Sequence, residues 1–154
     1  MRLDDPAVLE ILRRAKVARI ATLSANGRPS VTSIYFAYVN GHIWLGTADW
    51  TLAAREAAAD PRVSVLLQVE HNPQDRRILR ITGNAVVRTD GAAQRIFMIQ
   101  AALRYSWTPG GLLNQWQHRH LLGMMRRYHA QSAHKGKACV IDVTPESAEF
   151  LEAP

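Results

Sequence analysis

Two Asn-Gly pairs, at residues 26–27 and 40–41, constrain the fold of this chain more than any other feature. They separate three runs rich in β-branched and aromatic residues, at 17–24, 30–39 and 42–47. Asn40-Gly41 is the strongest hairpin signal, because a type I′ turn needs a positive φ at both central positions. The pattern predicts three antiparallel strands that follow one another and are joined by tight turns.

Helices flank and interrupt these strands. Residues 5–15 predict a short helix, because Asp5 is a good N-cap and Pro6 fits the first helical position, where a missing N–H costs nothing. Further helices are expected at about 51–59, 91–104 and 112–130. Pro61 stops the first of these three. The second begins after Asp90 and carries Ile96, Ile99 and Leu103 on one face.

Later strands complete the pattern. They are expected at 62–70, at 78–88 with a bulge or bend at Gly83, and at 137–143, with 147–152 as an extension past Pro145. Six or more short strands, hairpins early in the chain and helices between the later strands favour a mainly β fold. We expect one domain over residues 1–154: a closed, six-stranded antiparallel barrel with peripheral helices and a helical insertion at about 91–130.

Composition excludes several classes of protein. A chain of 154 residues suits one domain, and no apolar run approaches the length that spans a bilayer. Acidic residues stand near the N-terminus where a signal peptide would be basic and apolar, so a cytoplasmic location is expected. A single cysteine, Cys139, excludes an internal disulfide and a multi-cysteine metal cluster, and we expect no metal site.

Positive charge is concentrated late in the chain. The formal net charge is +6, and residues 104–137 hold six Lys/Arg and four histidines but no Asp or Glu. Such a field favours an anionic partner, which would be a phosphorylated cofactor, an acidic tail, nucleic acid or lipid; a solvated helix face is the alternative. The predicted helix 112–130 also carries one stripe of residues at helical spacing: Leu113, Trp116, His120, Met124 and Tyr128. Such a stripe is typical of core packing. The alternative is that it lines a substrate site.

The stretch "GTADWTLAAREAAADPRV", residues 46–63, joins the third strand to a helix through Thr47 and Thr51. Backbone N–H groups at a helix N-terminus, hydroxyls and the positive end of the helix dipole together bind phosphate. The first turn, "TLAA", carries no Lys or Arg. The junction therefore predicts a phosphate site whose counter-charge has to come from elsewhere.

The order of these cues resembles the FMN-binding split β-barrel family of pyridoxamine 5′-phosphate oxidase-like proteins. The matching segments are "ATLSANGRP", "YFAYVNGHIWLGT", "DPRVSV" and "ITGNA", within residues 15–88. The resemblance implies a homodimer with a flavin at the subunit interface. It places Thr32 and Ser33 along the flavin ring and ribityl chain, Gly46 and Thr47 at the strand end, and Thr51 at the helix start.

The sequence departs from this family where the family is basic. The Lys that usually follows the start of the helix corresponds to Leu52 or Ala53, and two strand cations of the vitamin oxidases correspond to Thr32 and Ala37. A lost charge-assisted contact costs about 1.5–3 kcal/mol. This argues against pyridoxamine phosphate oxidation and weakens FMN binding without excluding it. Arg55, one turn after Thr51, is the nearest replacement; Arg28 and the basic helix are others.

The resemblance leaves several functions open. The first is an FMN-dependent oxidoreductase acting on an unidentified small molecule, in which the cofactor supplies the redox chemistry and no catalytic triad is expected. The second uses the deazaflavin coenzyme F-420, whose acidic tail suits segment 104–137. The third is a haem-binding or non-catalytic barrel, with the histidines as iron ligands. Nucleic acid is a weaker possibility, because no binding signature accompanies the charge, and no membrane partner is expected.

Overall fold

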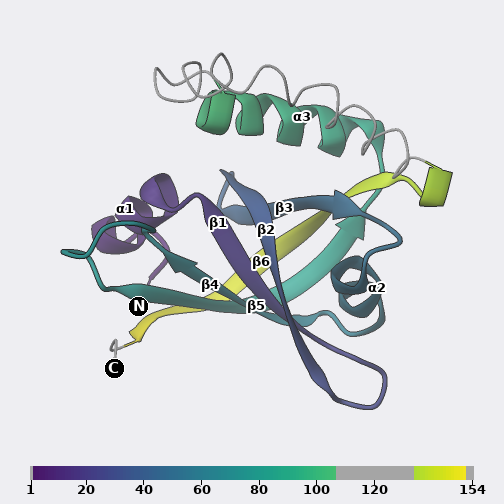
Figure 1. Cartoon of the computed structure of the whole chain (residues 1–154), viewed down its shortest axis with the longest axis horizontal. Helices are drawn as coiled ribbons and strands as arrows, with labels where there is room; N and C mark the ends of the chain where they lie inside the picture. Colours follow the sequence, from purple (N-terminus) through teal and green to yellow (C-terminus); the bar gives the residue numbers. More distant parts are fainter. Residues whose placement is uncertain (1, 107–133, 152–154) are drawn as a thin grey trace.

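The computed structural model describes residues 2–106 and 134–151 of the chain (Figure 1). Its elements are α1 (Pro6–Arg14), β1 (Val17–Leu23), β2 (Pro29–Val39), β3 (His42–Ala48), α2 (Leu52–Ala59), β4 (Arg62–Gln68), β5 (Ile78–Arg88), α3 (Gly91–Ala101) and β6 (Ala138–Leu151). A π-helical turn, Ala102–Ser106, follows α3. In the described residues no helix is long and apolar enough to cross a bilayer.

The strands close into a barrel in the order β1-β2-β3-β6-β5-β4, and every neighbouring pair is antiparallel. This confirms the predicted six-stranded antiparallel barrel. Strand β2 pairs with β3 only from Phe36 to Val39. Residues 29–35 of β2 are not paired with Gly46–Ala48 of β3, so the two strands separate and leave a split on that side of the barrel.

Local sequence signals explain the ends of several elements. Asn40 has φ 49° and Gly41 has φ 85°, as the predicted type I′ hairpin requires. Asp5 caps α1 by accepting a 2.9 Å hydrogen bond from the Ala7 N–H. Strand β6 continues through Pro145, and the β5–β6 register shifts at Thr82/Gly83, which confirms the predicted bulge. A side chain at Gly83 would collide with the Thr144 backbone.

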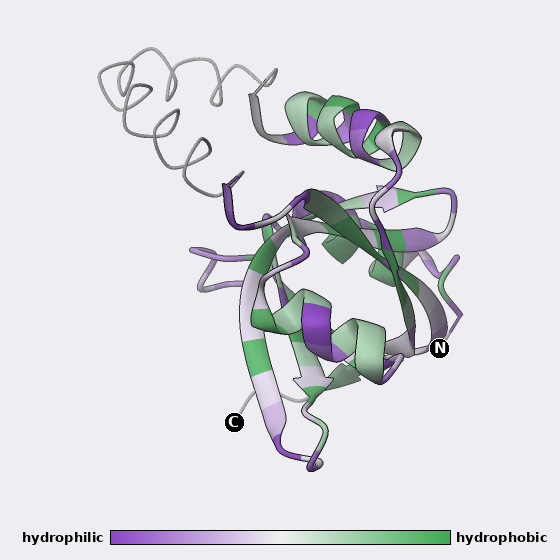
Figure 2. Cartoon of the chain, turned by 90° about the vertical axis from the view of Figure 1, so that its right-hand side faces the viewer, coloured by the Kyte–Doolittle hydropathy of each residue, from purple (hydrophilic) through white to green (hydrophobic). Residues whose placement is uncertain are grey.

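The core fills the barrel, and two helices close it. Helix α1 packs Val8, Ile11 and Leu12 into the core cluster, and α2 contributes Ala53 and Ala57 from the other side. Figure 2 shows α2 lying across the opening of the barrel. These small α2 side chains let the helix backbone approach the strands closely.

Helix α3 lies outside the barrel as a separate layer (Figures 1 and 2). It buries Ala93 and packs Phe97 against a second cluster that includes Trp44 and Val140. The predicted stripe of Ile96, Ile99 and Leu103 faces away from this cluster and is exposed. The predicted helix at 91–104 is α-helical only to Ala101, and the predicted helix at 112–130 lies outside the described residues.

Arg104, in the π-helical turn, ties the end of α3 to the end of α1. Its guanidinium donates to the carbonyl oxygens of Leu12, at 2.6 Å, and of Ala15. The same group stands 4.2 Å from the centre of the Phe36 ring. The unpaired carbonyls at a helix C-terminus attract a cation, so this contact fixes the outer layer on the barrel.

Candidate functional site

The junction between β3 and α2 joins two hydroxyl groups. The Thr47 Oγ1 atom lies 3.0 Å from the Thr51 Oγ1 atom. The Thr51 hydroxyl donates to the Ala48 carbonyl at 2.8 Å and accepts from the Ala54 N–H at 3.4 Å. Because the single Thr51 hydroxyl hydrogen is used on Ala48, Thr47 is the donor between the two threonines.

Thr51 is thus the N-cap of α2, and its residue type explains where the helix starts. The first N–H groups of a helix have no intrahelical partner, and the Thr51 side chain satisfies that of Ala54 alone. Leu52 and Ala53 supply the remaining N–H groups of the first turn. The start of α2 thus presents the N–H groups of Leu52 and Ala53 beside the two threonine hydroxyls, whose hydrogens are used within the junction.

A segment distant in the sequence lies beside this junction. Strand β6 pairs Ala138 with Ala48, and the Asp49 N–H donates to the Lys137 carbonyl at 2.9 Å. The Lys137 N–H returns a 3.0 Å hydrogen bond to Asp49 Oδ1. A side chain at Gly136 would collide with the Asp49 carboxylate, so glycine permits this close approach.

The structure separates Thr32 from Ser33. Successive side chains of a strand point to opposite faces. Thr32 lies on the same face of β2 as the buried Ile34 and Phe36 and is itself half-buried, whereas Ser33 is exposed on the outer face. The two residues therefore cannot line the same side of one flavin ring within a single chain.

Gly46 has a packing role within the chain. The Phe97 ring of α3 occupies the space that a side chain at position 46 would fill. Position 37, where the vitamin oxidases place a cation, lies in the apolar cluster under α3 and is almost completely buried. Arg55 is exposed on α2, and in the described residues its guanidinium has no ion-pair partner.

One carboxylate near this junction is buried, although the sequence gives no sign of it. Glu56 is 7% exposed and accepts hydrogen bonds from Thr22 Oγ1 at 2.6 Å and from Ser30 Oγ at 3.3 Å. It joins α2 to β1 and β2 across the split. A Glu in an alanine-rich helix is typical of a solvated face, and no periodic contrast in "LAAREAAA" marks position 56 as buried.

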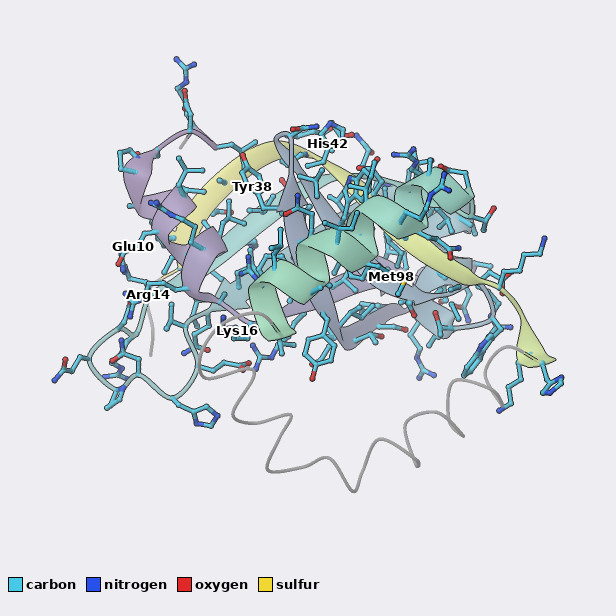
Figure 3. All side chains as sticks on the ribbon, turned by 90° about the horizontal axis from the view of Figure 1, so that it is seen from above. Glu10, Arg14, Lys16, Tyr38, His42 and Met98 are labelled. Carbon is cyan, nitrogen blue, oxygen red and sulfur yellow. The ribbon has the colours of Figure 1, made fainter. Side chains whose placement is uncertain are left out.

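A second polar cluster lies at the opposite end of β3. His42 Nδ1 is 2.7 Å from Asp142 Oδ1, and Arg88 donates to the other Asp142 oxygen at 3.5 Å. His42 lies at the edge of the barrel in Figure 3. Five residues of strand, about 16 Å, separate it from Thr47, so the two clusters are distinct sites.

Cys139 pairs with Thr47 across β3 and β6 and is buried. Burial, with a smaller contribution from the Asp49 carboxylate, raises the pKa of the Cys139 thiol to about 11. The thiol is therefore protonated at neutral pH and serves as a small apolar side chain.

The predicted helical stripe and the histidines at positions 118, 120 and 129 lie outside the described residues. His134 is described and exposed. Within residues 2–106 and 134–151, no group of three His, Cys, Asp or Glu side chains could hold a metal ion.

Comparison with known proteins gives one family and many similar folds. Residues 4–152 match the family model of pyridoxamine 5′-phosphate oxidase. A conserved hypothetical protein of Mycobacterium tuberculosis is 18% identical, with a TM-score of 0.70 over 99% of this chain and 86% of that one. No curated protein matches the chain in sequence.

Two further solved structures have the same fold. A Listeria innocua protein with the provisional name pyridoxamine 5′-phosphate oxidase is 17% identical, with a TM-score of 0.64 over 99% of this chain and all of that one. A structure named F420 reductase is 18% identical, with a TM-score of 0.62 over 91% of this chain and 94% of that one. At these identities the structures establish the fold alone.

Proposed function

The chain belongs to the pyridoxamine 5′-phosphate oxidase family, and we propose that it is a flavin-dependent oxidoreductase that binds FMN between two copies of the chain. The proposal rests on the contact between Thr47 and Thr51, whose Oγ1 atoms lie 3.0 Å apart at the start of α2. A helix N-terminus that carries free N–H groups and hydroxyls is a phosphate site. When bound, the flavin supplies hydride or electron transfer to a small molecule.

The residues of the junction can take up a phosphate with little rearrangement. Rotation about one side-chain bond turns the Thr51 hydroxyl hydrogen from the Ala48 carbonyl to an anion in front of the helix. The N–H groups of Leu52 and Ala53 point the same way, because helical N–H groups are directed toward the N-terminus. Arg55 stands one turn further on and adds a positive charge in this proposal.

The outer face of β2 supports a second copy of the chain as the other wall of the site. Val31 and Tyr35 are 65% and 63% exposed on either side of Ser33. Arg19 of β1 lies directly across from Ser33 in the strand register. A partner chain that covered this face would bury two large apolar side chains. It would also place Ser33 at the subunit interface. Gly46 and Thr32 would lie nearer the split between β2 and β3 of the same chain.

A deazaflavin is the second candidate cofactor. The chain shares its fold with the structure named F420 reductase. Residues 104–137 contain no Asp or Glu, which suits a cofactor with an acidic tail. Oxidation of pyridoxamine phosphate itself is not favoured, because Leu52 and Ala53 replace the usual helix cation and position 37 is packed among apolar side chains.

The test is a titration of the purified protein, freed of any bound chromophore, with FMN, a deazaflavin and haemin, followed by absorbance and fluorescence. Saturable binding of FMN or the deazaflavin at one site per chain, to a dimer in sedimentation, is the expected result. A Soret band with haemin, together with no flavin binding, would indicate a haem protein in which histidines bind the iron. Binding of none of the three would contradict the proposal.

A further inference from the structure

The phosphate site lacks the lysine that its family places in the first turn of the helix, yet a lysine reaches the same loop from the other end of the chain. Residues 134–137 precede β6 and lie against the β3–α2 loop through the two hydrogen bonds that join Asp49 to Lys137. The Lys135 Nζ atom stands 5.0 Å from the centre of the Trp50 ring. Trp50 directly precedes the helix cap.

A cation over an aromatic face is attracted electrostatically by the ring. An ammonium group has three N–H donors and no acceptor. The Trp50 ring face engages one side of the Lys135 ammonium, which leaves N–H donors for an anion. Trp50 therefore holds this positive charge against the residue that precedes Thr51 in the chain.

Lys135 offsets a negative charge at the β3–α2 junction. Asp49 places a carboxylate beside the junction, and one of its oxygens accepts from the Lys137 N–H. Without compensation, that carboxylate would repel a phosphate in front of α2. Lys135 and Lys137 provide two positive charges against this one negative charge, so the junction as a whole attracts an anion.

We propose that Lys135, held on the Trp50 ring, is the cation that pairs with the cofactor phosphate at the start of α2, in place of the lysine missing from positions 52 and 53. This assignment rests on the proposed function. It differs from the assignment of Arg55, which approaches from within the helix. The positive charge would come from the segment before β6, a part of the chain distant from α2 in sequence.

The experiment compares two flavins that differ only in the phosphate. Dissociation constants for FMN and riboflavin are measured by flavin fluorescence on the full-length wild type and on Lys135→Ala, Lys135→Arg, Lys137→Ala and Arg55→Ala. Lys135 is exposed, so its replacement should leave the fold intact, which far-UV circular dichroism checks. The deazaflavin with and without its phosphodiester tail forms a parallel pair if the protein prefers that cofactor.

We expect Lys135→Ala to weaken FMN binding by about tenfold to a hundredfold and to leave riboflavin binding unchanged, because one charge-assisted contact is lost. Lys135→Arg should keep most of the FMN affinity. Lys137→Ala removes the same net charge two residues away, but the structure ties Lys137 to Asp49 through its backbone N–H and carbonyl. Its effect on FMN should therefore be smaller.

Equal and small losses in Lys135→Ala and Lys137→Ala would overturn the assignment, as would a phosphate-specific loss in Arg55→Ala alone. A wild type that binds FMN and riboflavin equally well would also overturn it, while leaving flavin binding in place. A wild type that binds neither flavin nor the deazaflavin would contradict the proposed function itself, and the assignment of Lys135 would fall with it.

Discussion

The hydroxyl of Thr47, near the end of β3, donates to the hydroxyl of Thr51, the N-cap of α2, across 3.0 Å. One side-chain hydrogen bond thus links the end of a strand to the N-cap of the next helix. The same two oxygens are the side-chain groups that a phosphate in front of α2 would meet. The proposed phosphate site and the helix cap therefore use the same hydroxyl groups. Variants that test phosphate binding here must preserve the cap of α2.

Gly46 and Phe97 provide a test of how α3 is held on the barrel. The Phe97 ring fills the space of a side chain at position 46, so Gly46→Ala should destabilise the protein by about 1–3 kcal/mol through overpacking. Phe97→Ala in the same chain should relieve most of that cost. Urea denaturation of both single variants and the double variant measures the coupling between the two sites. Additive effects would show that the ring does not occupy this space.

Glu56 is the buried link between α2 and the β1–β2 hairpin. Glu56→Leu would leave the Thr22 hydroxyl, which is 1% exposed, without an acceptor, so the free energy of unfolding should fall by about 1–3 kcal/mol. Glu56→Gln keeps an acceptor oxygen at nearly the same volume, so its free energy of unfolding should fall by less. The free energy of unfolding from urea titrations separates the two variants. A leucine variant as stable as the glutamine variant would contradict this role.

Asp75 ties the β4–β5 loop to α1, where Glu10 and Arg14 lie on the side of that loop (Figure 3). Hydrogen bonds from Arg77 are the main cause that lowers the pKa of Asp75 to about 2. A carboxyl with a lowered pKa stabilises the fold above its unfolded pKa, near 3.9, and loses this effect as the pH falls through the folded value.

The stability difference between wild type and Asp75→Asn should therefore be constant from pH 7 to about 5 and should vanish as the pH falls toward 2. Because the Arg77 side chain is partly exposed, the difference at neutral pH should stay within about 1 kcal/mol. Chemical denaturation at several pH values measures it. A difference that grows as the pH falls would have the wrong sign for this ion pair.

Much of the barrel could be predicted because its signals are local. Asn40-Gly41 dictates its own turn through positive φ values, and Asp5-Pro6 marks the start of α1 within two residues. The order of strands then leaves few closed arrangements for so small a sheet. Even the bulge at Gly83 has a local sign, a glycine inside a strand pattern.

The contacts that shape the candidate site are not local, and one sequence does not show them. Glu56 meets Thr22 and Ser30 from 34 and 26 residues away. Phe97 contacts Gly46, and Lys135 contacts Trp50, across larger separations in sequence. The apolar stripe at 96–103 was visible in the sequence, but periodicity alone does not tell which face of α3 meets the barrel, and Ala93 with Phe97 does so.

The pair Thr51→Asp and Thr51→Asn provides a direct test of a phosphate bound in front of α2 at Thr51. Both replacements are good N-caps of nearly equal size, so both should preserve α2. They differ by one negative charge. We predict that Thr51→Asp weakens FMN binding at least tenfold relative to Thr51→Asn and leaves riboflavin binding the same in both, measured by fluorescence titration. Equal FMN affinities in the two variants would show that the phosphate does not bind at Thr51.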